Sequence, residues 1–413
     1  MFSFSSLLIR REYGEDEIVE KENKRDFKLH KCQKKHFFCF APAAGDFRWL
    51  TIIIATVGLV TLLSASYPAA IAKTGDPYFY VKRQFRYVIL GLILMEAVSH
   101  LNYQILRKWA KALLICSLFL LCAVLIPGIG VVRNNSRRWI ELLGIITFQP
   151  SEVAKLAVVL SFSASISAKK EKMQKFSTGI LPYSCILILI TALMLLEPHL
   201  SGLILILTVG AVLMFVGGIK LRWVFGASLL AMIGTYLFLS GKISYGQSRI
   251  AMWRNPFIDV SGAGYQLSQS LISIGSGGLF GVGFGRSMQK HLFLPEVQND
   301  FVFAIVCEEV GLIGAVLVLL LFAILIIKGF LIARAAPDRF GTLICVGIMT
   351  LFATQAFLNV AVVTGLLPTT GVSLPLFSYG GTAAVIQLIE LGIVLAVSRQ
   401  CCAPTKMIIP EDL

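Results

Sequence analysis

Residues 301–327 read FVFAIVCEEVGLIGAVLVLLLFAILII, an apolar run whose only charged residues are Glu308 and Glu309. At a rise of 1.5 Å per residue, about 20 apolar residues cross the hydrocarbon core of a bilayer. Within lipid, a segment must satisfy its backbone hydrogen bonds internally, which a continuous apolar run can do only as a helix. The stretch therefore predicts a membrane-spanning helix.

The rest of the chain repeats this pattern. Of the 413 residues, 56% are hydrophobic and only 15% are charged, whereas roughly a quarter of a soluble domain is charged. Continuous apolar runs do not fit a β-barrel, which needs short alternating strands. We expect an all-α polytopic membrane protein of about ten transmembrane helices. Besides 301–327, the expected spans are residues 49–68, 86–99, 109–126, 153–168, 179–196, 201–218, 223–240, 341–363 and 380–398.

The distribution of basic residues predicts the orientation. Ten spans place both termini on one side of the membrane, and with the N-terminus inside, basic clusters such as Arg107, Lys108 and Lys111 fall in inner loops. This agrees with the positive-inside rule, so both termini are expected in the cytoplasm. The same loops explain much of the net charge of +14, and without an aromatic-and-basic RNA motif we expect no nucleic-acid partner.

The domain organisation follows from these runs. Residues 1–45 are polar and of mixed charge, so they predict a cytoplasmic, disordered basic extension. Residues 46–400 form the transmembrane domain, and 401–413 a short cytoplasmic tail. The longest outer segment is a loop at 241–300. Within it, Tyr265 to Phe280 is mildly apolar but too short and glycine-rich to span, which favours an interfacial or re-entrant helix.

A polar block precedes and opens the fourth span. Arg137-Arg138-Trp139 are followed by FQPSEVAK at 148–155. Pro150 can open a helix, and Glu152 and Lys155, three residues apart, share a face. The two side chains form either a plain salt bridge that anchors the span or part of a site. The Arg-Arg-Trp run suits a site or an interfacial anchor equally.

Two further polar segments have structural interpretations. Residues 197–202, EPHLSG, predict a tight outer turn with polar caps. The glycines at 277–285 lack the strand-before and helix-after context of a dinucleotide-binding loop. Close backbone packing is the favoured explanation for these glycines.

Acidic residues meet the start of the 301–327 run in LPEVQND, residues 294–300. Carboxylates near membrane depth are costly and often functional. Asp300 at the mouth of the span is a candidate base whose pKa burial would raise, and it is also suited to cap the helix. For Glu308 and Glu309, structural hydrogen bonds or helix contacts are favoured.

A loop rich in proline and glycine precedes the last span. It reads GLLPTTGVSLPLFSYGG at 365–381. Such a sequence in an apolar setting predicts a rigid non-helical loop tucked into the protein. The loop serves as a structural plug or as a ligand contact that includes Ser378.

Together these motifs resemble the SEDS family of bacterial cell-wall proteins (shape, elongation, division and sporulation; the FtsW/RodA/SpoVE group). The resemblance runs from about Asp46 to Arg399 and is closer to the FtsW/SpoVE branch in its TTG motif and closing Val397-Ser398-Arg399. Two positions depart from the family pattern. His199 stands where Pro-Asp-Leu-Gly has its aspartate, and Asn299 replaces the usual threonine.

The resemblance implies a peptidoglycan glycosyltransferase that polymerises lipid II into glycan strands in septal or spore cell-wall synthesis. The family aspartate maps onto Asp300, which would deprotonate the 4-hydroxyl of the incoming sugar; the reaction would invert the anomeric carbon and expel undecaprenyl pyrophosphate. Basic side chains would hold the pyrophosphate. The candidate substrate-binding residues are Arg249, Lys290, Glu296, Arg138, Glu152, Lys155 and Ser378.

The resemblance also implies partners and a location. We expect a multi-pass protein of the bacterial cytoplasmic membrane, with its active face outside, that works with a class B penicillin-binding protein transpeptidase and other divisome or elongation-complex proteins. No organic cofactor is expected. A divalent cation, Mg²⁺ or Mn²⁺, could help neutralise the pyrophosphate, although no clear metal cage is visible. Two alternatives stay open, a lipid II flippase and a non-catalytic scaffold for the transpeptidase.

Overall fold

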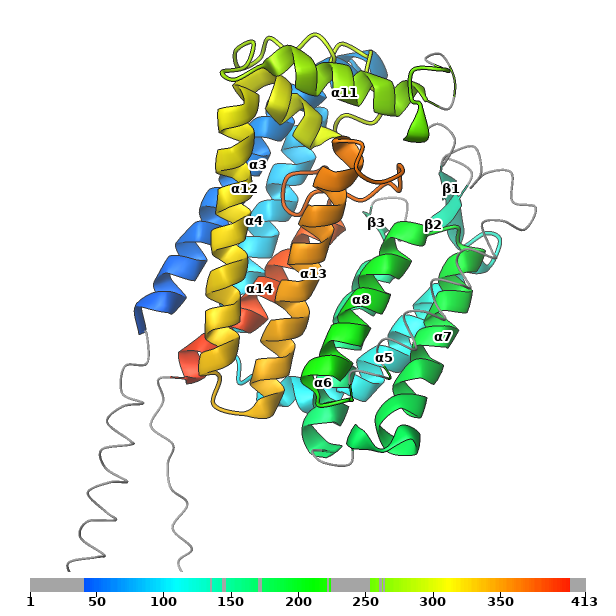
Figure 1. Cartoon of the computed structure of the whole chain (residues 1–413), viewed down its shortest axis with the longest axis vertical. Coiled ribbons are helices and arrows are strands. Elements are labelled where there is room, and N and C mark those ends of the chain that lie inside the picture. The colour runs from blue at the N-terminus through cyan, green and yellow to red at the C-terminus, as the bar shows by residue number, and fades with distance from the viewer. Residues whose placement is uncertain are drawn as a thin grey trace, which may run out of the picture. The chain divides into compact units, whose positions relative to one another are not determined.

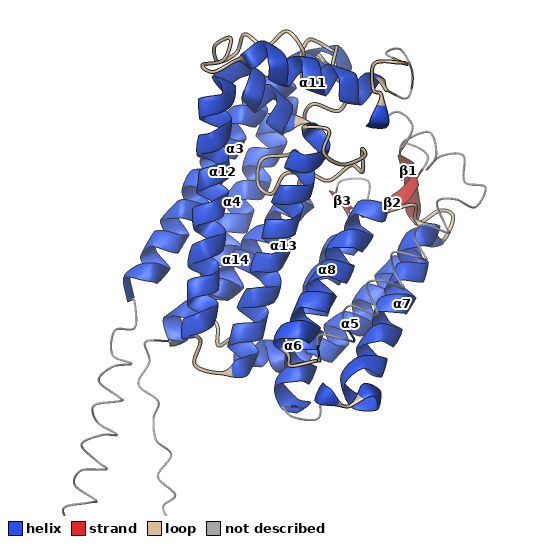
Figure 2. Ribbon diagram, viewed as in Figure 1, coloured by secondary structure: helices blue, strands red, loops and turns tan. Residues whose placement is uncertain are grey.

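The computed structural model describes residues 41–133, 136–142, 146–169, 173–220, 223, 253–259, 262 and 264–401. Most of these residues are helical (Figures 1 and 2). The helices are α3 (Ala41–Thr74), α4 (Phe79–Ser99), α5 (Gln104–Leu125), α6 (Pro150–Lys169), α7 (Leu181–Leu196), α8 (Leu200–Val216), α11 (Tyr265–Gly277), α12 (Val302–Ala335), α13 (Arg339–Val363) and α14 (Thr382–Gln400), with a π-helical turn, η2 (Phe176–Ile180), before α7.

The expected spans agree with these helices. Each expected run except 223–240 overlaps a described helix, and that run lies outside the described residues apart from Trp223. Seven described helices are long and apolar enough to cross a membrane, and α8 is a shorter apolar helix. The expected extension ends a few residues too late, because α3 already begins at Ala41; residues 1–40 and 402–413 lie outside the described part of the chain.

A small antiparallel sheet modifies the all-α expectation. Its strands β1 (Gly130–Arg133), β2 (Ser136–Leu142) and β3 (Ile146–Phe148) are hydrogen-bonded in that order. Val131 pairs with Trp139, and Ile140 pairs with Phe148. These strands lie between α5 and α6 and were not predicted from the sequence. They fix the main chain around Arg138.

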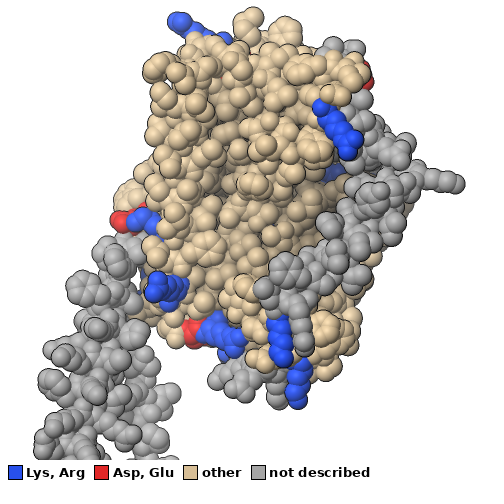
Figure 3. All heavy atoms as spheres, viewed as in Figure 1, with Lys and Arg blue, Asp and Glu red and all other residues tan. Residues whose placement is uncertain are grey.

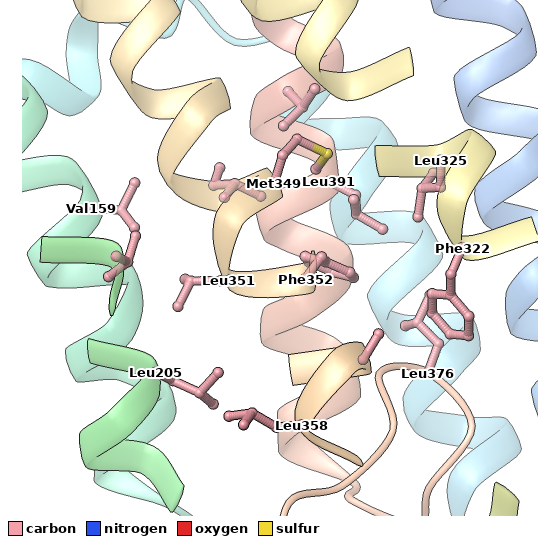
Figure 4. Close-up of a cluster of buried hydrophobic side chains, with 14 of the residues drawn as sticks. Val159, Leu205, Phe322, Leu325, Met349, Leu351, Phe352, Leu358, Leu376 and Leu391 are labelled. Carbon is pink, nitrogen blue, oxygen red and sulfur yellow. The ribbon is translucent and has the colours of Figure 1, made fainter. Parts of the chain in front are cut away.

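The core is built around α13, which packs against α6, α8, α12 and α14. Figure 4 shows Val159 and Leu205 on one side of Phe352, and Phe322 on the other, all buried. On the face drawn in Figure 3, the charged side chains of the described residues lie toward opposite edges, with a broad uncharged area between them. Such an uncharged surface fits contact with lipid.

One end of the helix bundle carries α11 and two loops. Figure 1 shows α11 running across the ends of the longer helices. It packs closely on α12, because a Cβ on Gly277 would lie 2.0 Å from the Cys307 carbonyl oxygen. A short helix and glycines used for packing were both expected here. The loop at 364–381 is non-helical and buries Val372, Leu374 and Phe377, also as expected.

Candidate active site

Asp300 is fixed by its main chain at the end of the turns that precede α12. Its N–H donates to the Glu296 carbonyl at 3.3 Å. The Asn359 side-chain amide of α13 donates to the Asp300 carbonyl at 2.8 Å and to the Val372 carbonyl at 2.6 Å. Asn359 therefore joins Asp300 to the loop at 364–381 and holds both in one place.

The expectation that Asp300 caps the helix was wrong. Helix α12 begins at Val302, its N-cap is Phe301, and no side chain hydrogen-bonds to that cap. Asp300 stands one residue too early to serve as the N-cap. Its carboxyl is therefore not needed to start the helix.

The carboxyl group of Asp300 faces the backbone of the 364–381 loop. A Cβ placed on Gly371 would lie 3.2 Å from Oδ2, and Gly371 has a φ of +72°. Both the close approach and the left-handed backbone favour glycine at this position. The loop thus forms one wall around the carboxylate.

Burial, and to a smaller extent the negative charge of Glu296, raise the pKa of Asp300 to about 6 against the opposing effect of Arg138. Glu296 adopts a φ of +52° and accepts hydrogen bonds from the side chains of Asn299 at 2.5 Å and Gln298 at 3.4 Å. A carboxylate with this pKa is mostly ionised at neutral pH, yet is more basic than an ordinary aspartate. Asp300 is therefore suited to accept a proton.

Arg138 connects the sheet to the turn between α7 and α8. Its guanidinium donates to the main-chain carbonyls of Glu197, at 3.4 Å, and Pro198. Its charge lowers the pKa of both Asp300 and Glu197. Arg138 and Glu296 are thus the two candidate binding residues whose charges act directly on Asp300.

Glu197 and His199 are buried beside Arg138. The Glu197 side chain is 1% exposed, and neither of its carboxyl oxygens has a hydrogen-bond partner among the described residues; the same holds for Nδ1 of His199. Burial raises the pKa of Glu197 to about 8 and lowers that of His199 to about 3. Both side chains are therefore mainly uncharged at neutral pH. The expected turn is present, but His199 as N-cap of α8 makes no side-chain capping bond.

Glu152 and Lys155 form a buried ion pair of 2.8 Å on α6. Lys155 Nζ also donates to Gln355 Oε1 at 3.5 Å. The amide nitrogen of Gln355 in turn donates to the Ser373 carbonyl at 3.0 Å. The predicted salt bridge is present, and through Gln355 it supports the loop that encloses Asp300.

Two candidate binding residues have contacts elsewhere in the protein. Lys290, a candidate for the pyrophosphate, is buried and binds Glu309 and Ser64, each at 2.9 Å. Ser378 is buried too, and its hydroxyl accepts a hydrogen bond from the Leu374 N–H at 2.8 Å within its own loop. Arg249 lies outside the described residues. The structure therefore does not bring Lys290 or Ser378 into contact with the Asp300 carboxyl.

Glu308 and Glu309 have the structural roles that were favoured. Glu308 accepts hydrogen bonds from the hydroxyls of Ser273 and Ser287 and from the Met288 N–H, at 2.6–2.9 Å. Glu309 accepts from Ser64 at 2.6 Å as well as from Lys290. These contacts tie α3 and the outer loop to α12.

Some residues of the site were not singled out from the sequence. Gln355 and Asn359 are polar amides four residues apart in the apolar run 341–363, and that spacing puts both on one helix face. This spacing could have been used to select Gln355 and Asn359 as candidate site residues.

An open hollow of about 430 Å³ lies near the sheet, lined by Leu125, Ser136, Arg137, Leu196 and Pro198. Arg137 lines this hollow, whereas Arg138, which lies at the irregularity in the pairing of β1 with β2, donates to the Pro198 carbonyl. The hollow therefore borders the candidate active site at Pro198.

The chain is similar to known proteins over most of its length. The family model described as "Cell cycle protein" (FTSW_RODA_SPOVE) matches residues 46–402. Stage V sporulation protein E of Bacillus subtilis is 39% identical over 350 residues, covering 85% of this chain and 95% of that protein. A probable peptidoglycan glycosyltransferase FtsW of Geobacter sp. (strain M18) is 38% identical over 351 residues, with the same coverage.

Solved structures of related proteins have a similar fold. A chain from a peptidoglycan synthase complex that coordinates polymerization and crosslinking superposes with a TM-score of 0.72 at 28% identity, covering 87% of this chain and 98% of that one. The rod shape determining protein RodA of Thermus thermophilus gives a TM-score of 0.64 at 28% identity, with 87% and 97% coverage. The chain therefore belongs to the FtsW/RodA/SpoVE family of polytopic membrane proteins.

Proposed function

We propose that this protein is a peptidoglycan glycosyltransferase that polymerises lipid II, with Asp300 as its general base. The observation that carries the proposal is the placement of Asp300. Its main chain is fixed by Asn359, its carboxyl faces Gly371, and burial brings its pKa to about 6. The relatives named as probable peptidoglycan glycosyltransferases support the reaction class.

In the proposed reaction, the Asp300 carboxylate removes the proton of the 4-hydroxyl of the incoming lipid II sugar. The oxygen forms a bond to the anomeric carbon of the growing glycan while the bond from that carbon to pyrophosphate breaks. The anomeric carbon is inverted, and undecaprenyl pyrophosphate leaves with the bonding electrons. A placed general base contributes about a hundred- to ten-thousand-fold to such a rate.

Arg138 is the proposed cation of the site. Its charge acts on Asp300, and a guanidinium suits phosphate oxygens. It keeps the base ionised and favours the negative charge that builds up on the leaving group. Arg249 stays a candidate for the same task. Lys290 and Ser378 are no longer proposed as ligands, because their polar groups are engaged elsewhere.

A divalent cation enters the proposal only as a partner of the substrate's pyrophosphate. Mg²⁺ is commonly bound through one or two carboxylates together with substrate phosphates. In the described part of the chain, no group of three or more His, Cys, Asp or Glu residues is arranged to hold a metal.

We propose that Asp300 faces the outside of the cytoplasmic membrane, with both termini in the cytoplasm. Helix α12 is interrupted at Gly311, where the backbone is non-helical (φ +70°), and it has Asp300 before its first turn and Arg334 in its last. The positive-inside rule then places Arg334 and Arg339 in the cytoplasm. The proposed partner is a class B penicillin-binding protein transpeptidase, by analogy with the synthase complex.

A lipid II flippase would be favoured by acidic residues deep in several helices, and the sequence offers Glu96, Glu308 and Glu309. Glu96 is partly exposed at the end of α4 and pairs with Arg399 at 2.6 Å and with Arg48 at 3.4 Å. Glu308 and Glu309 are fully engaged in structural contacts. None of the three marks a pathway across the membrane.

The test uses the protein purified with its transpeptidase partner and labelled lipid II. Asp300→Asn should reduce polymerisation about a hundredfold or more with an unchanged melting temperature, since Asp300 does not cap α12. Equal polymer from wild type and variant would remove Asp300 from the mechanism. No polymer from the wild type in a verified complex would contradict the enzymatic function itself.

A further inference from the structure

The open hollow beside the small sheet has no role in the mechanism above. Its volume is about 430 Å³. The described residues that line it come from separate segments: Leu125 ends α5, Leu196 ends α7, Ser136 and Arg137 begin β2, and Pro198 lies in the turn between α7 and α8. The hollow therefore lies where two helices end against the sheet.

In the proposed orientation the hollow lies at the outer surface of the membrane. Helix α5 contains Arg107 and Lys108 in its first turns, and the positive-inside rule places them in the cytoplasm. Its last residue, Leu125, is therefore on the outer side. The same holds for Leu196, because α7 follows the basic residue Lys175. Leu196 is 67% exposed, so one wall of the hollow is apolar and open to lipid chains.

The other wall carries a cation. Arg137 donates through Nη1 to the Leu125 carbonyl at 3.5 Å, which is long for a hydrogen bond, and it forms no ion pair with a carboxylate of the described residues. None of the described residues that line the hollow is acidic. A guanidinium presents several N–H groups in a planar fork that matches phosphate oxygens. The hollow therefore fits an amphiphile with a phosphate head and an apolar chain.

An irregularity in the sheet separates Arg137 from Arg138. Consecutive residues of β1 pair with Arg137 and with Trp139, so Arg138 between them has no partner on β1. A bulge of this kind redirects the neighbouring side chains. Arg138 donates to the Pro198 carbonyl, whereas Arg137 lines the hollow. The two adjacent arginines thus serve two places that share Pro198.

The proposed reaction uses two lipid-linked molecules, and each carries a pyrophosphate. In the growing glycan, the pyrophosphate is bonded to the anomeric carbon that reacts, so it must lie beside Asp300. In the incoming lipid II, the reacting 4-hydroxyl is on the sugar farther from the pyrophosphate. The two pyrophosphates are therefore held at different places, both at the membrane surface, because each polyprenyl chain stays in the lipid. Arg138 serves the place beside Asp300, and the hollow is the neighbouring place.

We propose that the hollow binds the pyrophosphate of the incoming lipid II and the first part of its polyprenyl chain. Arg137 binds the phosphate oxygens, and Leu125 and Leu196 contact the chain. The inference rests on the proposed polymerase function, and it separates the tasks of the two arginines. Arg137 holds the incoming substrate, whereas Arg138 acts on the leaving group.

The first experiment measures kcat and KM for labelled lipid II in the complex with the transpeptidase partner. Arg137→Gln should raise KM about tenfold or more, because it removes charged hydrogen bonds to the substrate, and should leave kcat within about twofold of wild type. Arg137→Lys keeps the charge and should raise KM less. Arg138→Gln should instead lower kcat. The matched control is Arg86→Gln, since Arg86 is an exposed arginine on the outer part of α4 that donates to the Lys82 carbonyl; its KM should equal that of wild type.

The second experiment measures equilibrium binding of labelled lipid II to the Asp300→Asn protein in nanodiscs of phosphatidylcholine, so that no turnover occurs. Adding Arg137→Gln should weaken binding about tenfold or more. Leu196→Trp fills the hollow while keeping Arg137, and it should weaken binding as well. This second variant decides the matter if Arg137→Gln lowers the melting temperature. Raising the fraction of phosphatidylglycerol in the nanodisc should leave the effect of Arg137→Gln unchanged.

The failures of the two proposals are distinguishable. Wild-type KM and affinity in Arg137→Gln, or an equal loss in Arg86→Gln, would overturn the role of the hollow while leaving the polymerase intact. Loss of the Arg137 effect as phosphatidylglycerol increases would also overturn it, because the hollow would then be an ordinary phospholipid site. If the wild type makes no polymer, the polymerase function fails, and the binding measurement alone decides whether the hollow takes lipid II.

Discussion

The carboxyl groups of α12 and those around Asp300 differ in how completely they are hydrogen-bonded. Glu308 accepts from two hydroxyls and from backbone N–H groups, and Glu309 binds a lysine and a serine. Glu197, by contrast, is just as buried but has no partner for either oxygen among the described residues. The hydrogen bonds of Glu308 and Glu309 fit a structural role, whereas a buried carboxyl group such as that of Glu197 needs another explanation, of which a chemical role is one.

Replacing Glu308 should give the largest change in stability. Glu308→Leu leaves the hydroxyls of Ser273 and Ser287 and the Met288 N–H without their acceptor, at a cost of about 3 kcal/mol or more. We expect a marked loss of folded protein and of melting temperature in detergent. Asp300→Asn is the matched control and should melt like the wild type. An unchanged melting temperature in Glu308→Leu would contradict the structural role.

Asn359 tests the link between Asp300 and its loop. Asn359→Leu keeps the size of the side chain but removes both hydrogen bonds, to the Asp300 and Val372 carbonyls. A displacement of about 1 Å at a reacting group costs about a hundredfold, so we expect polymerisation to fall between about tenfold and a hundredfold. Asn359→Asp is an informative companion, because it keeps the shape but cannot donate. A wild-type rate in both variants would show that Asp300 is held by other contacts.

Glu296 tests the electrostatics of the base. Its negative charge helps to raise the pKa of Asp300, so Glu296→Gln should move the acid limb of the rate profile to lower pH. The ratio of the variant's rate to the wild-type rate should be about twofold higher at pH 5.5 than at pH 7. The reverse shift, or none, would mean that the charge of Glu296 does not reach Asp300.

Glu197 is expected to have the smallest effect, which is on how the stability of the protein depends on pH. Its pKa is raised from 4.5 in the unfolded chain to about 8 in the folded protein, so the folded state holds a proton that the unfolded state has lost. The resulting stability is present below pH 4.5 and is lost as pH rises through 8.

The measurement compares melting temperatures of Glu197→Gln and wild type at pH 5 and pH 8. Glutamine cannot ionise, so the variant does not lose this stability. The melting temperature of Glu197→Gln minus that of the wild type should therefore be a few degrees larger at pH 8 than at pH 5. A difference that does not change with pH would mean that the Glu197 carboxyl ionises normally in the fold.

The sequence predicted most of the helices that the structure describes, and it singled out Asp300 as the residue proposed to be the base. Apolar runs over 301–327 and 341–363 have few alternatives to a spanning helix, and the structure has α13 and α12 there, the latter with a break at Gly311. The sheet at 130–148 was missed because its strands are three to seven residues long and carry polar side chains. Strands this short give no clear alternating pattern.

Contacts between distant residues determine where the candidate binding residues lie. Lys290 looks like an exposed cation in sequence, but its partners Ser64 and Glu309 come from two other segments. Ser378 looked available, yet its hydroxyl closes its own loop. The direction of a side chain depends on such contacts, and a single sequence does not reveal them.

The pH dependence of kcat/KM for lipid II, measured on the wild-type complex, tests the role of Asp300 most directly, because this quantity reports the pKa of the essential base in the free enzyme. We predict that kcat/KM rises through about pH 6, the pKa of Asp300, and is level at neutral pH. A rise near pH 8, the pKa of Glu197, would assign the base to that residue. A rise of kcat/KM near pH 4, which is typical of an exposed aspartate, would contradict the role of a buried Asp300 as the base.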